Sequence, residues 1–509
     1  MGQFENRSLL LLGLLVLCSS FLGINSGPLW NCLEAANGGV IREIVNSGNF
    51  IDLKIMGESA WQLSPLYYWL SSGIYYLLGD GAFSVRFWSP VASSATVMLF
   101  YLGVTNLFSE TVGFCSALVL ISSLLFTIFS KAAVVDTLFL LLLTWTILAY
   151  IYRKYWCMYL GWALSILTAG SLGLLLPGAI VLCHGLCFGS RGQWARLRGL
   201  GLVLLLVLPW YGGLYYYHGE EALAWAWNNY YYDGLVDYAY ATAGWWHYLL
   251  LLAWGFFPWV GLALLAIKHA IYDGRIDDLR KLQPFLLWLV LGLAFLSWHG
   301  VKSPAAAILL LPPLAVLVGW DLARLKEKQG RLTTYKSWLL LSGLNFAIFI
   351  CICLSWGRTQ GGELVFISQM LAAMLGLIAL TICYSLYHYR DLFLALWLHA
   401  LAGLATMLVL FVFAMPLVAQ NYNVAHLSDY YRHHCPFGSR LYVAQDLRQG
   451  HYYYSGRADY LLPQGELLEK VLADGSSKYF LVDGQGKQLL EKHCDVVQQM
   501  GDNYLLLQK

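Results

Sequence analysis

Long apolar segments alternate with short polar ones along most of the chain. Most of these segments approach the ~20 residues that a helix needs to cross the hydrocarbon core of a bilayer. Thirteen of them lie near residues 8–24, 83–106, 112–129, 134–151, 157–169, 171–189, 199–217, 246–267, 283–298, 304–320, 337–356, 363–385 and 391–417. Backbone groups find no water inside a bilayer, so such segments are expected to be helical. The pattern predicts an all-α polytopic membrane protein with about 13 transmembrane helices.

Two longer polar regions interrupt this pattern. In the loop 25–82, AANGGVIREIV indicates a short amphipathic helix, and WQLSPLYYWLSSGIYYLL indicates an aromatic helix lying at the interface. The loop 218–245 contains no Lys or Arg and is rich in Trp and Tyr, as an interfacial aromatic belt would be. We expect both loops on the exterior side.

The pattern changes after about residue 418. Charges return, and the β-rich runs LYVAQ, KYFLVD and NYLLLQ are separated by turn-forming DGSS and DGQG. We therefore predict a transmembrane domain at 1–418 and a small soluble α/β domain outside the membrane at 419–509. Two alternatives are open for Cys435 and Cys494 in this domain: a disulfide between them, or two cysteines that are not bridged to each other.

Composition and charge agree with a membrane protein. The chain is 59% hydrophobic and 12% charged, with a mean hydropathy of +0.60, which excludes a soluble globular protein of this length. The N-terminus and even-numbered loops carry sixteen Lys and Arg, against six in the odd-numbered loops. The positive-inside rule then places the N-terminus in the cytoplasm and the C-terminal domain outside. Residues 8–24 keep a second interpretation, a cleaved signal peptide.

A net charge of +2, distributed in this way, sets orientation and does not indicate nucleic-acid binding. Charged side chains near a membrane surface are costly to place, so each one raises a functional hypothesis. Glu34 in the first loop and Asp136 at the outer end of the fourth apolar segment are predicted to face the same side. The other charged residues in this group are Arg42, Glu43, Asp52, Lys54, Glu58, Arg86, Lys131 and Lys302.

The stretch LEAANGGVIREIVNSGNF (33–50) resembles the first exterior loop of the GT-C membrane glycosyltransferases of the protein mannosyltransferase and aminoarabinose transferase kind. Further family motifs follow in order. They are SPLYYWL (64–70), FSVRFWS (83–89), SKAAVVDTLFL (130–140), LTAGSLGLLLPG (167–178), LPWY (208–211), FPW (257–259) and VKSPAAAILLLPPLAVLVG (301–319).

The chain also departs from the family pattern. Leu33 stands where the family has the first acid of Asp-Glu, Ser64 where it has Lys before Pro, and Ala169 where it has Lys. Several positions that handle phosphate or acceptor in the family are therefore missing, whereas Arg86 and Lys302 remain.

The resemblance implies transfer of a sugar from a polyprenyl-phosphate donor to a lipid, glycan or protein acceptor at the outer face of the inner membrane, with inversion. Glu34 and Asp136 are the predicted catalytic pair, with Glu34 as base or as a holder of acceptor or metal. Lys302 and Arg86 are predicted to bind the donor phosphate, because a leaving phosphate gains negative charge.

Each of these residues also has a structural interpretation. Lys302 could be a helix-end lysine that reaches the headgroups, and Glu34 a helix N-terminal acid. Arg86 is expected to pair with Glu43 or Glu58, and Arg42 with Glu43, as scaffold or acceptor-positioning groups. No cofactor is certain: a divalent metal is possible, although His247 and His299 are each isolated at the interface.

Two other functions compete. The departures at Leu33, Ser64 and Ala169 are compatible with a non-catalytic relative that binds a lipid-linked sugar or scaffolds a complex. A transporter would need acids or broken helices near the middle of the bilayer, and the sequence offers almost none.

Overall fold

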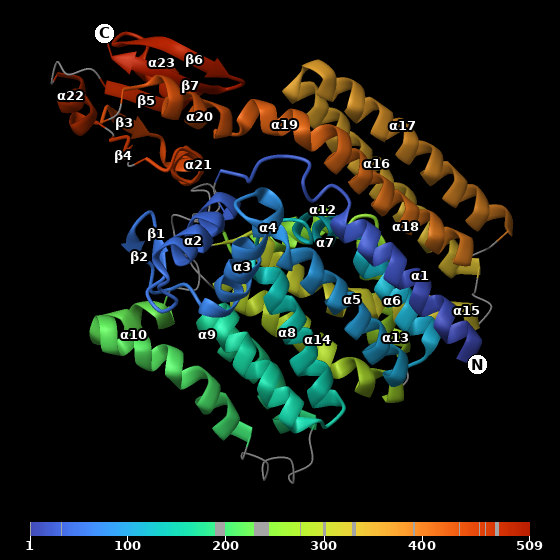
Figure 1. The fold of residues 1–509 in the computed structure, drawn as a ribbon. Helices are drawn as coiled ribbons and strands as arrows, with labels where there is room; N and C mark the ends of the chain where they lie inside the picture. The colour runs from blue at the N-terminus through green and yellow to red at the C-terminus, as the bar shows by residue number, and fades with distance from the viewer. Residues whose placement is uncertain are drawn as a thin grey trace.

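The computed structural model describes residues 2–31, 33–188, 199–228, 244–274, 276–298, 302–327, 332–389, 392–436, 438–457, 459–463, 465–473 and 478–508. It is a helical bundle with a small sheet region at its C-terminal end (Figure 1). The helices before the sheet region are α1 (Gly2–Phe21), α2 (Leu33–Ser47), α3 (Pro65–Leu78), α4 (Ala82–Arg86), α5 (Trp88–Leu107), α6 (Glu110–Ser122), α7 (Leu124–Phe129), α8 (Val135–Ile151), α9 (Tyr155–Phe188), α10 (Leu200–Asn228), α12 (His247–Gly255), α13 (Val260–Asp273), α14 (Ile276–Trp298), α15 (Leu311–Glu327), α16 (Leu332–Gln360), α17 (Gly362–Tyr384), α18 (Leu392–Val409) and α19 (Met415–Tyr422). Short 3-10 or π-helical turns are η3 (Ala305–Leu310), η4 (Ser385–Tyr389) and η5 (Leu410–Ala414).

The bundle confirms a polytopic membrane protein. Within the described ranges, eight helices are long and apolar enough to cross a membrane, or nine if the bent pair α12 and α13 forms one span. α15 with η3 is the central helix, and the apolar window of that span is wholly buried. The described parts of all thirteen predicted segments are largely helical. The number of thirteen crossings itself stays a prediction.

Two predicted neighbouring spans are the arms of one helical hairpin, α9. The chain reverses at Ala169 and Gly170, where Gly170 has a φ of +52°. The arms then pack closely: the Trp162 indole donates to the Leu174 carbonyl over 3.1 Å, and a Cβ on Gly173 would overlap the Ser165 carbonyl. Glycine is needed at 170 for the backbone angle and at 173 for the close approach.

The loop 25–82 carries both predicted helices. α2 matches the amphipathic prediction, with Ala36, Val40, Ile41 and Ile44 buried on one face. α3 begins at Pro65, which suits the first turn of a helix because its missing N–H is not needed there. Between them lies the two-stranded sheet of β1 (Lys54–Ile55) and β2 (Glu58–Ser59). Of the predicted loop 218–245, residues 218–228 continue α10 and residues 229–243 lie outside the described part.

The C-terminal region has an α/β fold, as predicted. Its strands are β3 (Arg440–Val443), β4 (Tyr460–Leu461), β5 (Lys478–Asp483), β6 (Cys494–Met500) and β7 (Asn503–Gln508), in the order β4-β3-β5-β7-β6. β3 is parallel to both its neighbours, whereas β7 is antiparallel to β5 and β6. Its helices are α20 (Ala425–His434), α21 (Gln445–Ser455), α22 (Glu466–Ala473) and α23 (Gly484–Leu490). The domain boundary at 418/419 stays a prediction.

No disulfide joins Cys435 and Cys494. Cys435 is buried with Leu441 and Leu481, whereas Cys494 is buried with Phe480 and Val482. Successive residues of a strand point to opposite faces of a sheet. The two thiols therefore lie on opposite sides of the sheet, so of the two alternatives the structure supports unbridged cysteines.

Candidate active site

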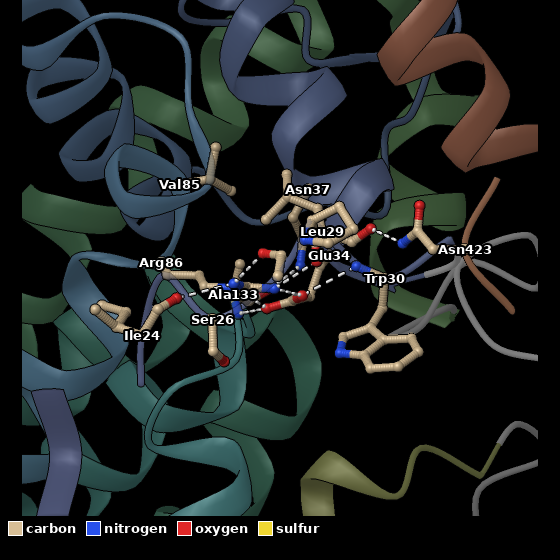
Figure 2. A network of polar contacts seen from close by, with 12 residues as sticks. Ile24, Ser26, Leu29, Trp30, Glu34, Asn37, Val85, Arg86, Ala133 and Asn423 are labelled. Atoms are coloured by element: carbon tan, nitrogen blue, oxygen red, sulfur yellow. Dashed lines mark hydrogen bonds and ion pairs between the residues drawn. The ribbon is translucent and has the colours of Figure 1, made fainter. Parts of the chain in front are cut away.

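Glu34 and Arg86 form a buried ion pair at the end of the bundle that carries α2 (Figure 2). The Arg86 Nε donates to Glu34 Oε1 over 2.9 Å, and an Nη donates to Oε2 over 2.6 Å. Three remaining N–H groups of Arg86 donate to the carbonyls of Ile24, Gly27 and Pro28. A guanidinium has five N–H donors, and all five are therefore in use.

This geometry corrects the expected partner of Arg86, which is Glu34 and not Glu43 or Glu58. Sequence reasoning treated Glu34 and Arg86 as separate functional groups, because 52 residues separate them. The pair is bidentate and satisfied throughout, so a bound phosphate would have to displace existing hydrogen bonds of Arg86.

The Glu34 carboxylate also holds backbone groups. Its Oε1 accepts from the Ala133 N–H over 2.7 Å, and its Oε2 accepts from the Trp30 N–H over 3.1 Å. One turn further along α2, the Asn37 amide donates to the Ala133 carbonyl over 2.8 Å. Residues three apart share one face of a helix, so α2 holds both the backbone N–H and the carbonyl of Ala133. Glu34 thereby fixes the start of α8.

Asp136, three residues beyond Ala133, lies in the first turn of α8 and is buried. Its carboxylate acts electrostatically on the hydroxyls of Tyr68 and Tyr248. The Tyr68 hydroxyl donates to Asn37 Oδ1 over 2.8 Å, which links this neighbourhood to α2. Burial raises the pKa of Tyr68 well above its ordinary range, with the Tyr67 and Asp136 charges as further causes.

Lys302 belongs to the same neighbourhood. The Tyr248 hydroxyl donates to the Ser303 carbonyl over 3.2 Å, next to Lys302. The Lys302 ammonium is buried and donates to the Ser297 carbonyl over 2.7 Å and the Leu296 carbonyl over 3.3 Å. Burial lowers the pKa of Lys302. Tyr248 thus bonds to the segment that carries Lys302 and lies within electrostatic reach of Asp136.

Arg42, Glu43 and Glu58 do not join this site. Arg42 pairs with Asp80 over 2.6 Å and lies over the ring of Tyr453, 4.1 Å from its centroid, which corrects the expected pair with Glu43. Glu43 is half-buried near the end of α2, and Glu58 is exposed on β2. Asp80 and Tyr453 were missed because neither stands near Arg42 in the sequence.

A mostly apolar cavity of about 190 Å³ adjoins the Glu34–Arg86 pair. Leu33, the departure from the family acid, lines it, as do Phe411 and Lys131. The Lys131 ammonium donates to the Ser19 carbonyl and lies 4.6 Å from the centroid of the Phe411 ring. Burial lowers the pKa of Lys131 to about 7. Sequence reasoning noted Lys131 as a charge but assigned it no role.

The other two departures from the family pattern are Ala169, at the tip of the α9 hairpin, and Ser64, beside that tip. Ser64 precedes α3, and its hydroxyl is 3.1 Å from the position of a Cβ on Gly170. Ala169 is buried in the turn. Among the described residues, no three His, Cys, Asp or Glu side chains gather to hold a metal ion. His299 lies outside the described part.

A family model described as dolichyl-phosphate-mannose-protein mannosyltransferase matches residues 62–212. The undecaprenyl phosphate-alpha-4-amino-4-deoxy-L-arabinose arabinosyl transferase 2 of Pseudomonas fluorescens (strain Pf0-1) is 29% identical over 341 residues, which are 63% of this chain and 61% of that protein. The corresponding transferase of Edwardsiella ictaluri (strain 93-146) is 25% identical over 386 residues, 71% of this chain and 69% of that protein. The chain thus matches about three-fifths of the length of the first relative.

Two solved structures share the fold. ArnT from Cupriavidus metallidurans, bound to undecaprenyl phosphate, superposes with a TM-score of 0.75 at 15% identity, covering 98% of this chain and 97% of that one. The archaeal oligosaccharyltransferase AglB from Archaeoglobus fulgidus superposes with a TM-score of 0.55 at 10% identity, covering 96% of this chain and 70% of that one. The likeness to ArnT extends through the sheet region as well as the bundle.

Proposed function

We propose that this chain, which is similar to the aminoarabinose transferases and shares the fold of ArnT, is a GT-C membrane glycosyltransferase that transfers a sugar from a polyprenyl-phosphate donor. The acceptor is a lipid, glycan or protein at the outer face of the inner membrane. The N-terminus lies in the cytoplasm and the C-terminal region outside, as the distribution of Lys and Arg indicates. The relatives named above carry the same donor class in their names.

The observation that carries the proposal is the buried neighbourhood of Asp136, Tyr248 and Lys302. An acid and a cation with few water contacts interact strongly with charge that develops during a reaction. In an inverting transfer, the acceptor oxygen forms a bond to the anomeric carbon while the bond from that carbon to the phosphate oxygen breaks. The phosphate leaves with the electron pair, and the acceptor proton goes to a base.

Asp136 is the proposed base, or the group that positions the acceptor, and Lys302 is the proposed cation for the leaving phosphate. The Glu34 carboxylate already accepts four hydrogen bonds, from Arg86, Ala133 and Trp30. We therefore assign Glu34 and Arg86 a positioning role, which places α2 and the start of α8 around Asp136. This replaces the catalytic role for Glu34 and the phosphate role for Arg86.

Asp136→Asn tests the proposal. It keeps the size of the side chain but removes its charge and basicity, so transfer should fall by about 100-fold or more, the lower end of what general-base catalysis contributes. Lipid-linked sugars and surface glycans from cells with the wild-type or variant gene are compared by mass spectrometry. An accumulating polyprenyl-phosphate sugar is expected in Asp136→Asn cells.

Asp277→Asn is the matched control, because Asp277 also lies in the first turn of a helix, α14, but is almost fully exposed. Transfer by this variant should equal that of the wild type. If Asp136→Asn is expressed normally and transfers sugar at the wild-type rate, the proposed role of Asp136 is wrong.

A non-catalytic relative is the second candidate, because Leu33 lines an apolar cavity where the family has an acid. Such a protein would bind a lipid-linked sugar without releasing polyprenyl phosphate. Deleting the gene would then leave both lipid-linked sugars and surface glycans unchanged in the same mass spectra.

A further inference from the structure

A second cluster of polar side chains lies where the loop after α2 meets α10. The loop contributes Asp52, Trp61 and Gln62, and α10 contributes His218 and Trp225. The Trp61 and His218 rings lie with their centroids 5.5 Å apart. Asp52, Gln62 and His218 are separate from the neighbourhood of Asp136 and are not used in the proposed transfer step.

Several polar atoms of this cluster meet no hydrogen-bond partner among the described residues. They are Asp52 Oδ1, Trp61 Nε1, Gln62 Nε2 and His218 Nε2, each shielded from solvent. His218 Nε2 and Asp52 Oδ1 lie 3.0 Å apart, within ion-pair distance, but their alignment is not that of a hydrogen bond. Gln62 as a whole is only 5% exposed.

The Gln62 amide is held in a fixed direction. The Trp225 indole donates to its Oε1 over 3.0 Å, so the carbonyl end of the amide is occupied. The Nε2 end then has two donors to offer elsewhere. Asp52 is also held, because the Lys54 ammonium lies 3.9 Å from its Oδ2. Trp225 therefore fixes the orientation of the Gln62 amide, and Lys54 lies beside the Asp52 carboxylate.

Buried polar groups without hydrogen bonds are rare, because burial removes the water that would satisfy them. Here Trp61 Nε1 and Gln62 Nε2 have no polar partner among the described residues, and Asp52 Oδ1 and His218 Nε2 have only each other, which indicates that something else completes the hydrogen bonding. The cluster offers one carboxylate acceptor together with amide, indole and imidazole nitrogens. A ligand that both donates and accepts at close intervals fits this set, as adjacent hydroxyl groups of a sugar ring do.

The cluster is also close to the segments that build the candidate active site. Gln62 is two residues before Ser64, which lies beside Gly170 at the tip of the α9 hairpin. The Ala226 carbonyl lies 3.9 Å from the position of a Cβ on Gly170, and it follows Trp225 directly. Ser64 in turn leads into α3, whose Tyr68 contacts Asn37.

We infer that Asp52, Trp61, Gln62 and His218 form a subsite for a pyranose ring, with Asp52 accepting from its hydroxyl or amino groups and the Gln62 amide donating to it. The inference rests on the proposed function, because a transferred sugar is the ligand that this chain would bring to the exterior loop. It does not depend on Asp136 or Lys302.

Binding of simple sugars to the purified full-length protein in lipid nanodiscs tests the inference. The probes are methyl pyranosides of pentoses and hexoses, with and without an amino group, and binding is followed by saturation-transfer NMR and tryptophan fluorescence. At least one probe should bind the wild type. Asp52→Asn and Gln62→Met should each weaken that binding by about tenfold or more, the loss expected for one hydrogen bond to a charged or buried group.

Asp429→Asn is the matched control, because Asp429 also lies beside a histidine, His433, but on the exposed surface of α20. It should bind the probe as the wild type does. The two loop variants act independently, so if one of them fails to fold, the other still tests the subsite.

Two results would overturn the inference. One is that no probe binds the wild type, which would leave ordered water as the occupant. The other is that Asp52→Asn and Gln62→Met fold and bind the probe with wild-type affinity. Sugar transfer is measured separately on lipid-linked donor. Binding that depends on Asp52 without any transfer would contradict the proposed function and leave the subsite in place.

Discussion

Arg86 is the side chain on which the geometry around the start of α8 depends most. It joins three carbonyls of residues 24–28 to the Glu34 carboxylate, and Glu34 in turn holds the Ala133 N–H. Its planar fork of donors is what makes this possible, because a lysine ammonium has only three donors at one point. A single residue thus connects the first loop, α2 and α8.

Arg86→Met should therefore destabilise the protein strongly. It leaves the Glu34 charge buried without a partner, and breaking a buried pair in this way costs about 3–5 kcal/mol. Thermal unfolding of the purified variant in detergent measures the loss. The double variant Arg86→Met/Glu34→Gln should recover part of it, since the buried charge is then gone. Wild-type stability of Arg86→Met alone would contradict the positioning role.

His451 gives the C-terminal region a dependence on pH. It is fully buried between the hydroxyls of Ser428 and Ser455, and burial, with the Arg457 charge as a second cause, lowers its pKa to about 3. The unfolded chain binds a proton below about pH 6.5, and the folded chain does not until about pH 3. The free energy of unfolding should fall as pH decreases through this window, by up to about 1.4 kcal/mol per unit.

Thermal unfolding of the full chain is measured at several pH values from about 7, just above the pKa of an unfolded histidine, down to about 4.5, which is still above the pKa of the folded one. His451→Gln removes the titrating group, so its slope should be flatter even if the variant is less stable throughout. Equal slopes for wild type and variant would show that other groups cause the dependence.

Charge identified Glu34, Asp136 and Lys302 in the sequence, because charged residues stand out in an apolar chain. Their partners could not be predicted in the same way. Arg86 lies 52 residues from Glu34, and the clamp on Ala133 joins positions that are 96 and 99 residues apart. Asn37 and Tyr68 lie within the motifs 33–50 and 64–70, but both are neutral, so the sequence assigned neither of them a role in the site.

Among the elements, the α9 hairpin requires a close approach of two helical arms. Gly173→Ala should destabilise the protein by about 1–3 kcal/mol, because the added methyl group overlaps the Ser165 carbonyl and forces the arms apart. Gly376→Ala in α17 is the matched control, since a Cβ there meets nothing within 4 Å. Thermal unfolding that is the same for both variants would contradict the close packing of the hairpin.

Element type was more predictable than element pairing. The apolar face of α2 and the aromatic run of α3 were visible as periodic patterns, and the reversal in α9 fell between two apolar segments at LTAGSLG. β6 was missed because the apolar and polar residues of CDVVQQM do not alternate as in a half-buried strand, and because it lies at the edge of the sheet, where few of its residues are buried. The disulfide alternative could not be resolved from sequence, because it depended on which sheet face each cysteine occupies.

At the scale of the whole molecule, α2 and α21 join the C-terminal region to the bundle. Arg42 bonds to the Tyr453 carbonyl and to Asp80, and the Tyr453 hydroxyl donates to Asp80 over 2.7 Å. Figure 1 shows α21 beside α2 at the top of the bundle. A polar cavity of about 720 Å³ lies along this contact, lined by Arg42, Asp80 and Arg432 among others.

Arg42→Gln should loosen this contact without unfolding either part, because it removes the ion pair and the cation–π contact together. Limited proteolysis of the purified protein is expected to cut faster near residues 422–425, between α19 and α20. Arg280→Gln, which changes an exposed residue paired only at 3.8 Å, should leave the rate unchanged. Equal rates for both variants would show that other contacts hold the region in place.

Residues 29–31 of the first loop are hydrogen-bonded to residues 423–454 of the C-terminal region near this contact. The Leu29 carbonyl accepts from the amide of Asn423 and the hydroxyl of Tyr454, and Asn31 Oδ1 accepts from the Val424 N–H. Residues 29–31 can therefore gain these bonds only after residues 423–454 have been synthesised, long after α2 and the early helices of the bundle. A nascent chain stopped before residue 420 would hold this loop through Arg86 and Glu34 but without these bonds, so the enclosure around Glu34 is completed only once the C-terminal region has been made.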